Sequence, residues 1–158
     1  MEPPMPTFRQ TVDIAATPDQ VWEVLGDVTS VDRWIPGVTA VTRTDSGRAC
    51  TFADGHTQDE RILDYSPATR SYRYLIDGAP LPVTDNTGRF AVEDTGGQAR
   101  VVWESSFRPT DPSTAEQVAE LWAPFMPMVL ANLKRVVEER ERSGATGPGT
   151  AADDAPKP

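Results

Sequence analysis

Two side chains that could move protons lie close together in the stretch "HTQDERILDY", residues 56–65. The stretch alternates like a β-strand, so an inward Ile62 brings Gln58 and Glu60 to its own face, and His56 follows the same alternation. A carboxylate or an imidazole beside a substrate can act as a general base, which makes Glu60 and His56 the candidate catalytic residues. Each also has a simpler interpretation. Glu60 can pair with a neighbouring arginine, since a buried carboxylate needs a partner, and His56 can be a polar loop-tip residue.

The same alternation in two later strand-like runs adds aromatic and polar groups to this inner face. It directs Tyr74 inward in "SYRYLI", and Trp103 and Ser105 inward in "VVWESSF". Tyr74 or Gln58 would then be placed to polarise a carbonyl group. The interpretation as core residues is favoured for Trp34, Trp103 and Trp122, although in a hollow protein one ring can both pack in the core and contact a ligand.

Composition removes several classes of function. Cys50 and His56 are the only cysteine and histidine, so the sequence predicts no disulfide and no zinc or haem site with several Cys and His ligands. A net charge of -9 argues against a nucleic-acid partner. There is no glycine-rich phosphate loop, no carboxylate spacing typical of a metal site and no long apolar run. We therefore expect no cofactor, no metal and no membrane insertion. The start "MEPPMPTF" lacks a signal peptide's basic and apolar regions, which predicts a cytoplasmic protein.

The elements that position these residues can be read in order along the chain. Residues 1–6 and 143–158 are poor in groups to bury and are expected to be disordered, leaving a single domain at 7–142. A first strand is followed by a helix with Thr17 as N-cap and Pro18 at its first position, and then by a brief helical turn. Short β-rich runs separated by turn residues follow, typical of an antiparallel meander.

A long C-terminal helix is expected from the N-cap Asp111 to Arg142, with apolar residues repeating at helical spacing. Pro124 and Pro127 each remove an intrahelical hydrogen bond, so a kink or break is predicted between residues 120 and 126.

Four stretches, in this order, carry a resemblance to a known superfamily: "VDIAATPDQVWEVLGDVTSVDRWIPGV", "DERILDYSPATRSYRYLIDGAPLPVTD", "VVWESSF" and "LANLKRVVEER". The sequence resembles the START-related and birch-pollen-allergen-like proteins, of the polyketide cyclase/dehydrase and lipid-transport type. The resemblance implies an α+β helix-grip fold. In that fold a seven-stranded antiparallel curved sheet wraps around a long C-terminal helix, with two short helices after the first strand and an apolar cavity between sheet and helix.

The expected cavity gives roles to further residues. Met128 and Asn132 lie one turn apart on the C-terminal helix, so both are expected to face the cavity, with Phe125 near its mouth. The loop "GAPLPVTDN" falls where a closing loop lies in the plant abscisic-acid receptors of this superfamily, and its Leu81 and Pro82 are expected to cover the mouth. The complete set of expected ligand-binding residues is Trp34, Gln58, Glu60, Tyr74, Leu81, Pro82, Trp103, Ser105, Phe125, Met128 and Asn132.

The resemblance implies binding of a small, largely apolar metabolite, lipid-like or polyketide-like, by a carrier or a sensor. The alternative is a polyketide aromatase/cyclase, in which the cavity folds a poly-keto chain and Glu60 or His56 moves protons. We expect a monomer or a weak homodimer in either case.

Overall fold

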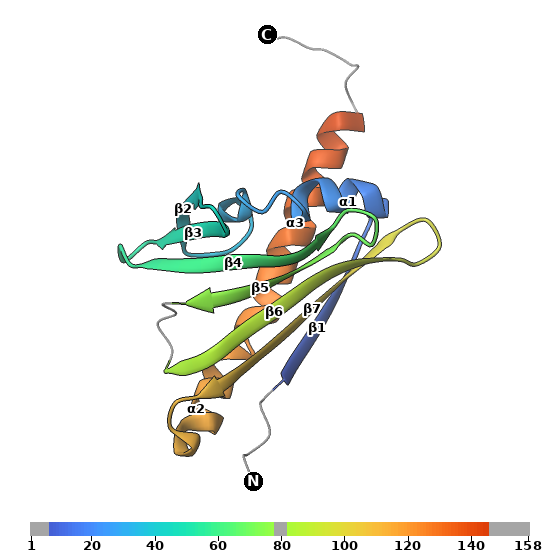
Figure 1. Ribbon diagram of the computed structural model, residues 1–158. Helices are drawn as coiled ribbons and strands as arrows, with labels where there is room; N and C mark the ends of the chain where they lie inside the picture. The colour runs from blue at the N-terminus through green and yellow to red at the C-terminus, as the bar shows by residue number, and fades with distance from the viewer. Residues whose placement is uncertain (1–6, 78–81, 146–158) are drawn as a thin grey trace.

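A seven-stranded antiparallel sheet curves around the C-terminal helix, as expected for the helix-grip fold (Figure 1). The computed structural model describes residues 7–77 and 82–145. The strands are ordered β1-β7-β6-β5-β4-β3-β2 across the sheet. The strands and helices, in chain order, are β1 (Thr7–Ile14), α1 (Pro18–Leu25), η1 (Val31–Arg33), β2 (Val38–Arg43), β3 (Gly47–Phe52), β4 (Thr57–Ser66), β5 (Ser71–Asp77), β6 (Val83–Asp94), β7 (Ala99–Pro109), η2 (Pro112–Thr114), α2 (Ala115–Trp122) and α3 (Phe125–Ala145).

The first helix begins where the sequence predicted. The Thr17 side chain accepts a hydrogen bond from the Gln20 amide, and the Gln20 side chain accepts one from the Thr17 amide. This capping box satisfies two amide groups that the start of a helix leaves unpaired. The second short helix is a single 3₁₀ turn, η1.

The C-terminal helix is broken where the prolines predicted. Helix α2 ends at Trp122 and α3 begins at Phe125, so the break falls at Pro124. Pro127 lies in the first turn of α3, where a missing amide hydrogen costs no intrahelical bond. Asp111 caps the preceding turn η2 by accepting a hydrogen bond from the Ser113 amide. Helix α3 continues to Ala145, beyond the domain boundary expected at residue 142.

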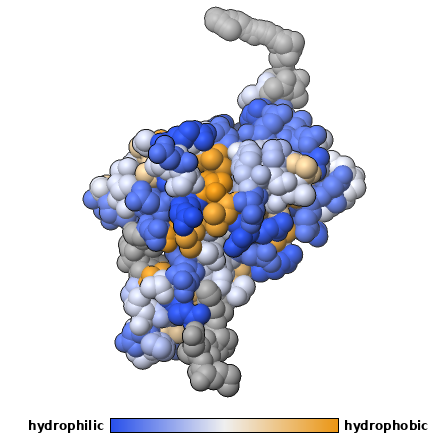
Figure 2. Space-filling model, in the orientation of Figure 1, coloured by the Kyte–Doolittle hydropathy of each residue, from blue (hydrophilic) through white to orange (hydrophobic). Residues whose placement is uncertain are grey.

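The core lies between the inner face of the sheet and α3. Val129, Leu133 and Val137 of α3 are fully buried. Tyr74, Trp103 and Ser105, which were predicted to face inward, are buried. Ile62, also predicted inward, packs against the core but is only partly buried. Figure 2 shows one apolar strip on the face in view, flanked by hydrophilic surface.

Gly88 of β6 allows a close approach that shapes the inner face. It lies opposite Tyr74 of β5, and a Cβ atom at this position would lie 2.1 Å from the Tyr74 hydroxyl. Only a residue without a side chain lets the Tyr74 ring lie this close to the β6 backbone.

We expect Gly88→Ala to lower the free energy of unfolding by about 1–3 kcal/mol, because the methyl group must displace the Tyr74 ring. Thr87→Ala, one residue away on the opposite face of β6, should cost less. Denaturant unfolding of both variants measures the difference, and equal losses would contradict the close-approach argument.

Candidate functional site

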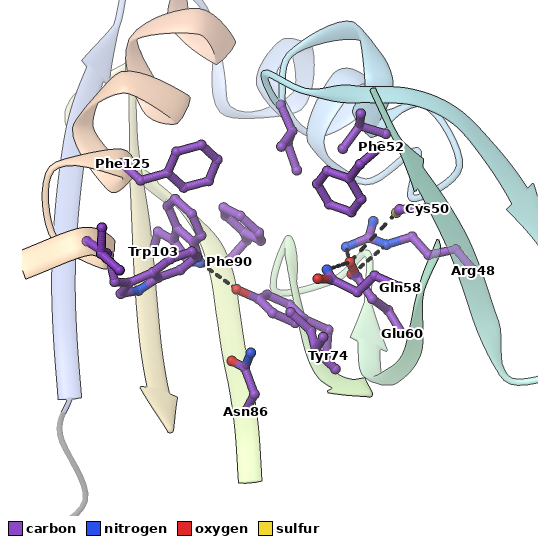
Figure 3. Close-up of a pocket in the computed structure, with 15 residues that line it drawn as sticks. Arg48, Cys50, Phe52, Gln58, Glu60, Tyr74, Asn86, Phe90, Trp103 and Phe125 are labelled. Carbon is purple, nitrogen blue, oxygen red and sulfur yellow. Dashed lines mark hydrogen bonds and ion pairs between the residues drawn. The ribbon is translucent and has the colours of Figure 1, made fainter. Parts of the chain in front are cut away.

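A cavity of about 270 Å³ opens between the inner face of the sheet and the junction of α2 and α3 (Figure 3). One side of its wall is polar and carries Arg48, Gln58 and Glu60. The other side is aromatic and includes Phe90 and Trp103. The remaining wall residues are Ile35, Val38, Cys50, Phe52, Tyr74, Ile76, Asn86, Leu121, Trp122 and Phe125.

The polar side is built around a buried ion pair. Arg48 of β3 and Glu60 of β4 lie opposite each other in the sheet and are only 2% and 7% exposed. The Nε and Nη2 groups of Arg48 donate to Glu60 Oε1 at 2.9 and 2.7 Å, and Nη1 donates to the Val28 carbonyl at 2.8 Å. The second carboxylate oxygen accepts from Gln58 Nε2 at 2.8 Å. Both charges are therefore paired and hydrogen-bonded, as burial requires.

The ion pair makes Glu60 a poor general base. Both of its oxygens already accept hydrogen bonds, and a permanent cation lies against it. Of the two interpretations of Glu60, pairing with an arginine is the one that the structure contains. Arg48 was missed at the sequence level, although alternation offered a signal: an inward Cys50 places Arg48 on the same face.

Cys50 lies beside the ion pair. It is 1% exposed, and its Sγ lies 3.7 Å from Glu60 Oε2. Burial, together with the nearby negative charge of Glu60, raises the pKa of the Cys50 thiol to about 12. The group is therefore a protonated thiol, not a nucleophilic thiolate, at neutral pH.

The aromatic side is connected to the polar side by Tyr74. Trp103 Nε1 donates a hydrogen bond to the Tyr74 hydroxyl at 2.7 Å, and Phe90 stacks on Trp103 with ring centroids 4.9 Å apart. Burial raises the pKa of Tyr74, so its hydroxyl stays protonated. Trp122 and Phe125 close this side from the α2–α3 junction, with ring centroids 5.5 Å apart.

Five of the expected ligand-binding residues meet on the cavity wall: Gln58, Glu60, Tyr74, Trp103 and Phe125. Two others are buried away from the wall. Trp34 packs edge-on against Phe90 in the core, with centroids 5.5 Å apart. Ser105 is 1% exposed, and its hydroxyl has no hydrogen-bond partner in the described part of the chain.

The expectation that Met128 and Asn132 face the cavity is wrong. Met128 is 49% exposed, and the Asn132 side chain accepts a hydrogen bond from Arg135 on the outer side of α3. The fully buried Val129 and Leu133 occupy the inward side of the helix instead. Pro82 is exposed and is not part of the cavity wall. Leu81, the other expected lid residue, lies outside the described residues.

His56 lies one layer behind the wall. Its ring stacks on Phe52, a wall residue, with centroids 4.5 Å apart and planes 4° from parallel. Its Nδ1 contacts Asp54 at 2.5 Å, while Nε2 is buried without a partner among the described residues. An imidazole held by a carboxylate at one nitrogen and free at the other has the arrangement of a general base.

Most of the wall residues were not among the expected ligand-binding residues, and Phe90, Trp122 and Asn86 are three of them. Phe90 lies opposite Trp103 in the β6–β7 pair, and Trp122 is brought in by the α2–α3 break. Asn86 is 9% exposed, and its side-chain amide makes no hydrogen bond with the described residues. Among the described residues there is no group of three or more metal-ligating side chains. None of the described helices has the length and apolarity that crossing a membrane requires.

Removing one partner of the ion pair should be costly. We expect Arg48→Met to lower the free energy of unfolding by about 3–5 kcal/mol, because Glu60 is left as an unpaired buried charge. The double variant Arg48→Met/Glu60→Leu removes both charges and should be more stable than the single variant. Denaturant unfolding of the two proteins measures this, and a double variant no more stable than Arg48→Met would refute the ion-pair argument.

Comparisons with known proteins agree with this architecture. Residues 5–138 match the family model described as "Polyketide cyclase / dehydrase and lipid transport". An uncharacterised protein of Mycobacterium tuberculosis is 27% identical over 144 residues, which cover 84% of this chain and 85% of that protein. The structure of the protein XoxI from Bacillus cereus is 28% identical, with a TM-score of 0.77 over 87% of this chain and 99% of that one.

The Zhui aromatase/cyclase from a Streptomyces species is similar in fold, with a TM-score of 0.73 and 22% identity over 91% of this chain and 99% of that one. The match to the family model covers most of the described domain, and the helix-grip architecture agrees with it. This chain belongs to the polyketide cyclase/dehydrase and lipid-transport family.

Proposed function

We propose that this chain binds a small, largely apolar molecule in the cavity between the sheet and the α2–α3 junction, as a carrier or a sensor. The observation that carries the proposal is the wall itself, which is mostly aromatic and aliphatic with a few fixed polar groups. Sites for small organic ligands have this composition, and the cavity volume of about 270 Å³ lies just below their usual range of about 300–1,000 Å³. The family description, which includes lipid transport, supports the same reading.

A specific observation favours enzymatic cyclisation as a second candidate. The buried, unpartnered Nε2 of His56 and the contact between Nδ1 and Asp54 suit proton transfer, although Phe52 lies between the ring and the cavity. Movement of the Phe52 side chain would bring the imidazole to a substrate. Glu60 is the weaker base of the two candidates, because its carboxylate is committed to Arg48.

Identification of a natural ligand is the direct test of binding. The native protein would be purified without organic solvent, extracted, and the extract analysed by mass spectrometry beside a variant with a blocked cavity. The wall position Ile76 offers that variant, Ile76→Trp, because the larger ring occupies the space of the ligand. A compound present with the native protein and absent from the variant supports the proposal.

Leu121 provides a second test, because it lies on the cavity wall and is still 67% exposed. We expect Leu121→Gln to weaken binding of the uncharged fluorophore N-phenyl-1-naphthylamine by roughly 3- to 10-fold, since apolar contact at the mouth is lost. Stability should change by less than about 0.5 kcal/mol at such an exposed position. The matched control Met128→Gln, exposed on α3 away from the wall, should bind the fluorophore normally. Equal affinity of both variants would remove Leu121 from the site.

The cyclase candidate makes its own prediction. With a triketide thioester as substrate, His56→Ala should reduce the rate of cyclisation about 10²-fold or more, the contribution of a general base. Asp54→Asn should reduce it less and shift the pH profile, because the ring keeps its place but loses its carboxylate. Absence of turnover by the native protein, or full turnover by His56→Ala, would rule out this candidate with His56 as base.

A further inference from the structure

The polar groups of the cavity have fixed hydrogen-bonding directions, beginning with Tyr74. An indole nitrogen can only donate, so the Tyr74 oxygen must accept the 2.7 Å hydrogen bond from Trp103. The Tyr74 proton then has no acceptor among the described residues. Burial holds the pKa of Tyr74 above its ordinary value, so the proton is retained. Toward the cavity, Tyr74 is therefore a hydrogen-bond donor.

Gln58 has the opposite direction. A carboxylate bound to an arginine can only accept, so the Gln58 amide nitrogen must be the group that contacts Glu60 Oε2 at 2.8 Å. Its carbonyl oxygen is left without a partner in the described part of the chain. Figure 3 shows Gln58 beside Glu60, with Tyr74 on the same cavity wall. Toward the cavity, Gln58 is therefore a hydrogen-bond acceptor.

The wall also has no uncompensated charge. Its charged groups are Arg48 and Glu60, which neutralise each other at 2.7 Å. An ionised ligand would leave water without gaining a free counter-charge, which is costly in an apolar site. The uncommitted amide of Asn86 can donate or accept and excludes neither kind of ligand group.

We infer that the ligand is an uncharged aromatic compound small enough for the cavity of about 270 Å³, with a carbonyl-type acceptor for Tyr74 and a hydroxyl or N–H donor for Gln58. This inference rests on the proposed binding function and adds the class of compound. The aromatic wall formed by Phe90, Trp103 and Phe125 contacts the ring system. The two fixed polar groups set which way round it binds.

A matched set of naphthalenes tests the inference on the full-length protein by titration calorimetry. The set comprises 6-hydroxy-2-acetonaphthone with both groups, 2-acetonaphthone with the acceptor, 2-naphthol with the donor, and the anion 6-hydroxy-2-naphthoate. At a pH that keeps the hydroxyl protonated, the hydroxyketone should bind tightest and each single-group compound about 5- to 10-fold more weakly. The anion should bind weakest of the four.

Two tyrosine variants locate the acceptor. Tyr74→Phe should weaken binding of both ketones by about 5- to 10-fold and leave 2-naphthol unchanged. Tyr65→Phe is the matched control, since its hydroxyl bonds to the Gly26 carbonyl away from this cavity. If Tyr74→Phe does not fold, the ranking of the four compounds on the native protein decides alone.

The outcomes separate this inference from the function on which it rests. If neither the naphthalenes nor N-phenyl-1-naphthylamine bind, the proposed binding function fails. If N-phenyl-1-naphthylamine binds but the hydroxyketone does not bind tightest, or the anion matches it, the function stands and the inference is wrong. Equal effects of Tyr74→Phe on all four compounds would also overturn it.

Discussion

The ion pair between Arg48 and Glu60 is the constraint on which the hollow interior depends. A cavity removes packing partners from the surrounding side chains, so the wall near it needs another source of rigidity. Here Arg48 joins β3, β4 and the carbonyl of Val28 after α1, while Gln58 fixes the second carboxylate oxygen. Moving either Arg48 or Glu60 away would leave the other as an unpaired buried charge. This cost keeps both side chains in one arrangement.

The aromatic side of the cavity is also held rigid, but by ring stacking and a hydrogen bond instead of an ion pair. Phe90 and Trp103 stack on each other, and the hydrogen bond from Trp103 fixes the phenol of Tyr74 over Gly88. Because Gly88 has no side chain, the Tyr74 ring has room to lie against the β6 backbone. Rigid polar groups on one side and rigid rings on the other leave a space whose shape and hydrogen-bonding pattern exist before a ligand arrives, which lowers the ordering cost of binding.

Local patterns in the sequence predicted the strands and helices, the family resemblance predicted their helix-grip arrangement, and only some of the wall residues were predicted. Strand alternation placed Gln58, Tyr74 and Trp103 on the inner face, and proline chemistry located the break before Phe125. Alternation from an inward Cys50 places Arg48 on the inner face, but the pairing of Arg48 with Glu60 depends on strand register, which alternation alone does not contain. The prediction that Met128 faces the cavity was wrong for a related reason. Helical spacing shows which residues share a face, but packing against the sheet decides which face is buried.

The division between affinity and selectivity follows from the energies of these groups. Burying the apolar surface of a two-ring compound contributes about 25 cal/mol per Å², whereas a hydrogen bond that replaces one to water adds only about 0.5–1.5 kcal/mol. The Tyr74 and Gln58 groups would therefore act mainly by weakening the binding of ligands that lack the matching hydrogen-bonding groups. A ligand without an acceptor would leave the Tyr74 hydroxyl buried and unpaired, at a cost of about 1–3 kcal/mol. Under the proposed binding function, an apolar wall suited to many compounds becomes selective through two groups whose directions are fixed by their neighbours, Trp103 and Glu60.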